Sequence, residues 1–355
     1  MSRKFSVEGA VNLYSSSPSI LFASELYLAK EYDELRKDLE LCNLYIITNR
    51  KKIHIDPSSL KVEGACIKGI LIVCRDQAWT RLEFNFPMQA EHHAGSPSDV
   101  KIHKEYSSSY ITITNINSQT IRIPTYILVA GSCADFREET DLDVLYVGIG
   151  IGKTKPRIAV DRLLTHYQLQ KILAKTITDE PESEIIILMF RFEHSRKILS
   201  NGGDLSLDPT ASDEEDDEHF TKLQTAKLPR KNRVLLAEAA LINYFKPPYN
   251  TMHRNTNFAS QKRMILTKML DEQGITGVIV EVCTSNIKSR LKSDTRPPKS
   301  LEELLPGADF SWLREATLEQ KTAAQTWLSD VAHSCTVNIP LTSPSIRNTF
   351  LHGLF

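Results

Sequence analysis

One carboxylate in an apolar helical segment constrains this chain more than any other residue. Residues 233–246 have helical spacing, and Val234, Leu241 and Phe245 fall on one side of the expected helix with Glu238 among them. An ionised carboxylate buried there without a partner would cost on the order of several kcal/mol. Glu238 must therefore meet a cation, a metal ion or a hydrogen-bond donor. A structural arginine partner and a functional site both satisfy this requirement.

Further patterns flank Glu238 in the sequence. An apolar run broken by glycines, 144–150, carries Tyr146, and a helix is expected over 158–175. Arg162 and His166 lie four residues apart on that helix, so they project from one face. Two prolines end the Glu238 helix, and Asn250 follows them.

This order of residues resembles the GIY-YIG nuclease superfamily. In that family a small sheet carries two tyrosine motifs, one helix carries an arginine followed by a histidine or tyrosine, and a second helix carries a glutamate followed by a proline and an asparagine. The resemblance implies a metal-dependent endonuclease of α/β (α+β) class, with a small GIY-YIG-like sheet flanked by helices. It also implies a role for each matching residue: Glu238 binds Mg²⁺ or Mn²⁺, Arg162 clamps a phosphate, Tyr146 lies at the nucleophilic water, His166 transfers a proton, and Asn250 positions the site.

The first tyrosine motif matches least well. The segment 124–131 is rich in Tyr, Ile, Leu and Val, which favours a strand, and it offers Tyr126 as the second tyrosine at the water. Thr125 and Pro124 stand where the family has isoleucine and glycine. The connection from Tyr126 to Tyr146 would be an enlarged loop, as in some restriction-enzyme members.

Binding of nucleic acid must come from local basic patches, because the formal net charge is −1. Lys153 and Lys155 follow the glycine-rich run, and Arg230 and Lys231 precede the Glu238 helix. We expect these four residues to contact phosphates of double-stranded DNA. The expected biological role of the protein is restriction or defence. A nucleotide-binding Walker loop is disfavoured, because Val147 occupies the place of its first glycine. The alternative is a noncatalytic nucleic-acid-binding or scaffold protein on the same fold.

The chain is expected to fold as three parts. Residues 1–105 form an N-terminal α+β domain of unknown role, and 106–258 form the nuclease domain with a mobile acidic insertion at 195–232. Residues 259–355 form a C-terminal extension, which either completes the N-terminal domain or recognises the substrate. The six cysteines form no Cys-x-x-Cys pair, which favours a reducing compartment. No apolar run reaches the length of a membrane span, so we expect a cytoplasmic protein with no membrane partner.

Overall fold

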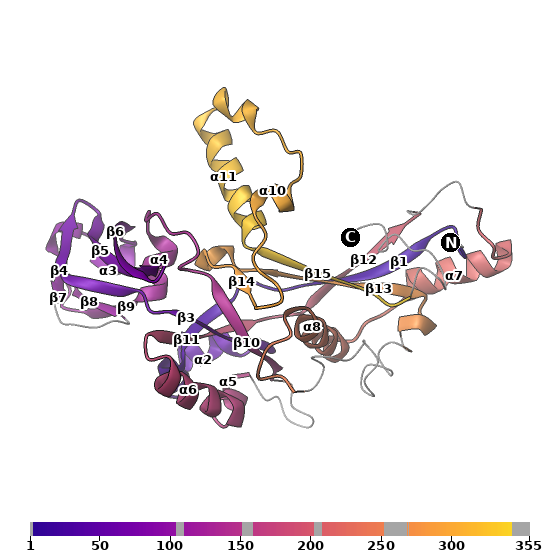
Figure 1. Ribbon diagram of the computed structural model, residues 1–355, viewed down its shortest axis with the longest axis horizontal. Helices are drawn as coiled ribbons and strands as arrows, with labels where there is room; N and C mark the ends of the chain where they lie inside the picture. Colours follow the sequence, from indigo (N-terminus) through magenta and orange to yellow (C-terminus); the bar gives the residue numbers. More distant parts are fainter. Residues whose placement is uncertain are drawn as a thin grey trace.

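The structure is a computed structural model, and it describes residues 3–103, 110–150, 159–201, 208–251, 268 and 270–342. The protein is a mixed α/β molecule of elongated shape (Figure 1), with two larger β-sheets at its centre and a smaller β domain at one end. None of the helices in these ranges is long and apolar enough to cross a membrane.

A five-stranded sheet, here called the tyrosine sheet, organises one half of the body. Neighbouring strands of this sheet are antiparallel, except for one short parallel pair at an edge of the sheet. Both faces are covered, so its strands are apolar almost throughout, and every residue of the fourth strand is buried. The strands in spatial order are β14 (Leu291–Lys292), β10 (Leu142–Ile149), β3 (Leu44–Lys51), β11 (Ser183–Phe190) and β2 (Ser19–Phe22).

A second sheet of four strands lies beyond the helix that carries Glu238. This helix, α8 (Arg230–Phe245), runs between the two sheets (Figure 1), and its buried side chains join both sheets in one hydrophobic core, here called the central core. The second sheet contains, in spatial order, β12 (His194–Ser200), β1 (Glu8–Tyr14), β13 (Ile275–Cys283) and β15 (Ser334–Pro340). Because α8 is enclosed from two sides, most of its surface is apolar.

Short helices cover the other face of the tyrosine sheet and form a separate helix-side core with it. They are α1 (Leu28–Glu31), α2 (Asp33–Leu39), α5 (Ala159–Leu163) and α6 (Tyr167–Asp179), with a 3₁₀ turn, η1, at Ala23–Leu26. The helix expected over 158–175 is thus divided in two. His166 has extended backbone angles (φ −86°, ψ 110°) and stands at the N-cap of α6, so Arg162 and His166 lie on either side of a break.

The chain between β3 and β10 folds as an inserted β domain with its own core, drawn from residues 53–136. Its two three-stranded sheets have the orders β4-β5-β6 and β7-β8-β9. The elements are β4 (His54–Glu63), β5 (Cys66–Arg75), β6 (Ala78–Pro87), α3 (Ala90–His93), η2 (Pro97–Asp99), β7 (Lys101–His103), β8 (Tyr110–Thr114), β9 (Thr120–Pro124) and α4 (Thr125–Gly131).

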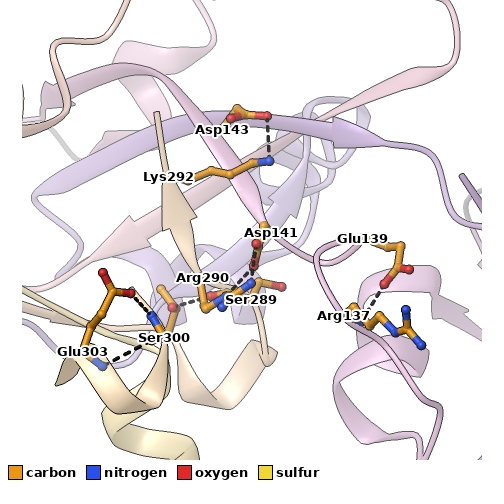
Figure 2. Close-up of polar contacts among 10 residues, drawn as sticks. Arg137, Glu139, Asp141, Asp143, Ser289, Arg290, Lys292, Ser300 and Glu303 are labelled. Atoms are coloured by element: carbon orange, nitrogen blue, oxygen red, sulfur yellow. Dashed lines mark hydrogen bonds and ion pairs between the residues drawn. The ribbon is translucent and has the colours of Figure 1, made fainter. Parts of the chain in front are cut away.

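Ion pairs connect the end of this insertion, and the start of β10 that follows it, to the C-terminal part of the chain (Figure 2). Arg290 donates two hydrogen bonds to the carboxylate of Asp141, at 2.8 and 2.7 Å, and the side chain of Asp141 is only 1% exposed. Lys292 on β14 lies 3.8 Å from Asp143 on β10. The remaining C-terminal elements are η3 (Ser285–Ile287), α10 (Leu301–Leu304), η4 (Ser311–Arg314) and α11 (Leu318–Ala332), and Thr317 and Gln320 form a capping box at the start of α11.

Strand pairing does not follow the three expected parts of the chain. β1 of the expected N-terminal domain (1–105) pairs with β12 and β13, and β3 pairs with β10 and β11. The expected nuclease domain (106–258) and C-terminal extension (259–355) are joined in the same way, because β13 of the extension packs on α8 in the central core. The separate unit is the insertion, which the boundary at 105 would cut in two.

The expectation of a mobile acidic insertion at 195–232 is wrong for the described residues. Residues 194–200 form β12, and the acidic run opens a helix, α7 (Asp213–Thr225), with Ser212 and Glu215 as a capping box. Acidic residues in a first helical turn are stabilised by the helix dipole. His219 stacks on Phe5 with ring centroids 3.8 Å apart, so tertiary packing holds this helix in place.

Candidate active site

A β-bulge aims Tyr146 at the candidate site. The register of β10 against β3 shifts between Val144 and Tyr146, so Leu145 is an extra residue in the strand. Val144 and Val147 face the central core, whereas Leu145 and Tyr146 both face the helix-side core. In a regular strand Tyr146 would share the face of Val144. The bulge therefore places the phenol on the helix-side face.

Asn250 holds the open edge of β10 beside this bulge. Its side-chain Oδ1 accepts a hydrogen bond from the backbone N–H of Val147, and its Nδ2 donates to the carbonyl of Val147, both at 2.9 Å. The N–H of Tyr249 donates to the carbonyl of Leu145 at 3.2 Å. Residues 249 and 250 thus act as a substitute for a neighbouring strand. Asn250 therefore holds the backbone of the residue that follows Tyr146, and this is the contact through which it would position the site.

Tyr45 on β3 is the second tyrosine of the cluster, and sequence reasoning missed it. Its ring centroid lies 6.2 Å from that of Tyr146, and its side chain is fully buried. Gly148 is its cross-strand partner, and a Cβ at Gly148 would lie 2.6 Å from the Tyr45 hydroxyl oxygen and 2.7 Å from Cε1 of Tyr146. Glycine is therefore required at 148 to make room for both rings. The strand-like run at 43–48 contains Tyr45, but it lies about a hundred residues before Tyr146. Nothing in the local sequence therefore connects the two tyrosines.

Arg162 and His166 approach the tyrosines from the helix side. Nη1 of Arg162 donates to the carbonyl of Ile149 at 2.7 Å, which fixes the guanidinium beyond the end of β10. The imidazole of His166 lies 5.1 Å from the Tyr146 ring and 5.9 Å from the Tyr45 ring, centroid to centroid. Arg162 and His166 thus both lie at this end of the tyrosine sheet, although the break between α5 and α6 separates them.

Glu238 contributes its charge to the same cluster from α8. Glu238 is half-buried, and after burial its charge is a further cause of the raised pKa of both Tyr45 and Tyr146, so its field reaches the two phenols. It follows that residues from β3, β10, α5, α8 and the turn before α6 share one site. Four of them, Tyr146, Arg162, His166 and Glu238, are residues that the sequence pattern named.

Electrostatics fix the protonation states at neutral pH. Burial raises the pKa of Tyr45 well above its ordinary value, and the charge of Arg162 opposes the rise. Burial raises the pKa of Tyr146 in the same way. For His166, burial and then the charge of Arg162 lower the pKa below 6.5. The phenols are hydrogen-bond donors, and the neutral imidazole is the group that can accept a proton.

Tyr126 lies outside this cluster, and its expected place on a strand is wrong. The segment forms α4 directly after its N-cap, Pro124, and Leu128 and Val129 pack in the core of the insertion. The hydroxyl of Tyr126 contacts the carbonyl of Ile20 at 3.4 Å and Glu25 at 3.3 Å. Its ring packs in the central core, on the opposite face of the tyrosine sheet from Tyr45 and Tyr146.

Of the four expected phosphate contacts, two can be placed. Lys153 and Lys155 lie outside the described residues. Arg230 and Lys231 occupy the first turn of α8, where Arg230 approaches Glu193 at 3.5 Å and Lys231 is exposed. Lys231 and Glu238 are seven residues apart, so they project in nearly the same direction from α8, about 10 Å apart along its axis.

A divalent cation at this site would have Glu238 as its carboxylate ligand. Within the described ranges no three His, Cys, Asp or Glu side chains gather into a cage for a metal ion. Mg²⁺ commonly binds through one or two carboxylates, with water and substrate oxygens completing its shell. Glu238 can supply the single carboxylate that such binding needs.

Comparisons with models of known protein families, with curated proteins and with solved structures find no match to this chain.

Proposed function

We propose that this protein is a metal-dependent endonuclease of GIY-YIG type that hydrolyses phosphodiester bonds, with double-stranded DNA as substrate and restriction or defence in the cytoplasm as its role. The observation that carries the proposal is the convergence of Tyr45, Tyr146, Arg162, His166 and Glu238 at one place in the fold. Tyr45 and Tyr146 stand on adjacent antiparallel strands, as the two tyrosine motifs of that family do.

Each group has a part in phosphodiester hydrolysis. Arg162 offers planar N–H groups that can bind two oxygens of one phosphate. The protonated phenols of Tyr45 and Tyr146 orient the attacking water and the phosphate oxygens by hydrogen bonding, and neutral His166 accepts the proton that the water loses. A divalent cation on Glu238 would supply charge compensation for the oxygens that become negative.

The first turn of α8 supports an anionic substrate. Arg230, Lys231 and Arg233 stand at the positive end of the helix dipole, where carboxylates are the favoured residues, and the first turn of α8 itself contains no acidic residue. Arg230 lies 3.5 Å from Glu193, and Arg233 donates to the carbonyl of Leu228 at 3.1 Å, so exposed Lys231 is the cation that the proposal assigns to a phosphate. A phosphate chain passing Lys231 toward Glu238 would meet this cation and the positive end of the helix dipole.

The test is a single-turnover cleavage assay on end-labelled duplex DNA with Mg²⁺ or Mn²⁺. Wild-type protein should cleave only with metal present. Glu238→Gln and Tyr45→Phe should abolish or severely slow cleavage with unchanged thermal stability, because each removes one functional group and keeps the side-chain shape. Tyr126→Phe is the matched control and should cleave at the wild-type rate, since its hydroxyl faces Ile20 and Glu25.

Two outcomes would overturn the proposal. Full metal-dependent cleavage by Glu238→Gln would remove the carboxylate from the reaction. Metal-independent binding of DNA by wild-type protein, with neither DNA nor RNA cut, would favour the noncatalytic alternative on the same fold.

A further inference from the structure

The free edge of β15 forms one wall of a groove on the second sheet. The N–H of Thr284 donates to the carbonyl of His333 at 3.0 Å, and the N–H of Leu341 donates to the carbonyl of Thr276 at 2.8 Å. In an antiparallel ladder the direction of the backbone groups alternates along the strand. The N–H and C=O groups of Cys335, Val337 and Ile339 therefore point to β13, and those of Ser334, Thr336 and Asn338 point away from it.

No described strand pairs with this second row of backbone groups, because β15 is the last strand of its sheet. Edge strands are ordinarily protected by charge, by proline or by a covering segment. Here Pro340 ends the strand, but the edge before it carries Ser334, Thr336 and Asn338. These three residues line a cavity of about 460 Å³ together with side chains of α8, α11 and the loop after β14.

The walls of the groove carry aromatic and cationic groups. Trp327 on α11 is 49% exposed beside it, and the guanidinium of Arg296 lies over the ring of Tyr244, 4.8 Å from its centroid. Lys299 adds a second cation, against one lining carboxylate, Asp330. Among the described residues, no carboxylate lies within ion-pairing distance of either cation. The groove thus offers alternating backbone donors and acceptors, an indole surface and an excess of positive charge.

We propose that this groove binds an extended segment of a partner protein, which adds to the second sheet as a strand beside β15 and carries carboxylates among apolar residues. Main-chain hydrogen bonds to Ser334, Thr336 and Asn338 supply the general affinity of such strand addition. Carboxylates facing Arg296 and Lys299, and an apolar side chain against Trp327, supply the selectivity.

The shape of the groove favours one strand over a second copy of this chain. α10 and α11 stand out from the body above β15 (Figure 1), and α11 contributes to the opposite wall. A symmetric pairing of two β15 edges would bring both α11 helices to the same edge. Six carboxylates against two cations in residues 300–333 would then oppose each other across the two-fold axis.

The experiment uses the full chain and a blocked, fluorescein-labelled seven-residue peptide that alternates valine with glutamate, measured by fluorescence anisotropy. The peptide should bind, and Thr336→Pro should weaken it by about tenfold or more, because proline removes an N–H that points into the groove. Thr336→Ala is the matched control, since it keeps the N–H. Proline is tolerated at edge positions, so thermal unfolding should show both variants folded.

A second probe separates strand addition from simple charge attraction. The same peptide with alternate backbone nitrogens methylated keeps every side chain and loses the donors, so it should bind at least about tenfold more weakly. Arg296→Glu with Lys299→Glu should reverse the preference toward a valine–lysine peptide. This inference is independent of nuclease activity, which the Thr336 variants should retain.

Equal binding by Thr336→Pro, equal binding of the methylated peptide, or no binding up to about 1 mM peptide would each overturn the proposal. A wild-type dimer that Thr336→Pro converts to monomer in sedimentation would assign the edge to a second copy instead. Direct binding of a labelled single-stranded oligonucleotide, lost in the double glutamate variant but kept in Thr336→Pro, would assign the groove to nucleic acid instead.

Discussion

Replacement of Asn250 by alanine should destabilise the protein and silence the candidate site together. The amide of Asn250 makes both of its 2.9 Å hydrogen bonds to the backbone of one residue, Val147, which is 0% exposed. Alanine would leave a buried N–H and a buried C=O without partners, and no solvent reaches them. At about 1–3 kcal/mol for each of the two unsatisfied groups, the expected loss is roughly 2–6 kcal/mol.

Equilibrium urea unfolding, followed by tryptophan fluorescence, measures this loss. Asn117→Ala is the control, because Asn117 is exposed on a turn and its replacement should change the free energy of unfolding by less than about 0.5 kcal/mol. Cleavage by folded Asn250→Ala should also fall, since the bulge that aims Tyr146 loses its support. A free energy of unfolding within about 0.5 kcal/mol of wild type would refute the reasoning, because it would mean that the clamp on Val147 adds nothing to the folded state.

Three further predictions test other parts of the structure. Gly148→Ala should abolish cleavage in the single-turnover assay while the protein stays folded, because its Cβ would meet the Tyr45 hydroxyl at 2.6 Å; normal turnover would show that the rings have room to spare. Arg290→Met should lower the free energy of unfolding by roughly 3–5 kcal/mol, since it strands a buried carboxylate, and adding Asp141→Leu should restore most of the loss in the same urea titration. Cleavage should rise with pH through a value below 6.5, because the pKa of His166 is lowered in the folded state. The unfolded chain binds that proton more readily, so stability should fall as pH drops from about 6.5 through the lower folded pKa, and His166→Gln should flatten both profiles; an acid limb above pH 6.5 would contradict this assignment.

Local patterns predicted those parts of the site that depend on neighbouring residues. Glu238 stood out because a helix of this apolarity has no ordinary place for a carboxylate, and the prolines after it placed Asn250. Such signals need only a few adjacent residues.

The parts that failed depend on contacts between distant segments. Tyr45 lies about a hundred residues before Tyr146, and only the pairing of β3 with β10 brings them together. Tyr126 sits in a run of strand-forming residues, yet the segment forms a helix that packs in the core of the insertion. The acidic run at 213–218 suggested disorder by composition, whereas the contact of His219 with Phe5 requires the far end of the chain.

The place of the inserted β domain has a consequence for the order of folding. Pairing Tyr45 with Gly148 requires the chain to close a loop of about a hundred residues, and contacts of such long range ordinarily form slowly. The core of the insertion is drawn from residues 53–136 alone, so the insertion can fold before the two strands pair. Once it has folded, the end of β3 and the start of β10 lie close together. We therefore expect the amides of β5 and β6 to gain protection in pulsed hydrogen exchange before those of β3, and simultaneous protection would contradict this. The domain that separates the two tyrosines in sequence then serves as the template that brings them together.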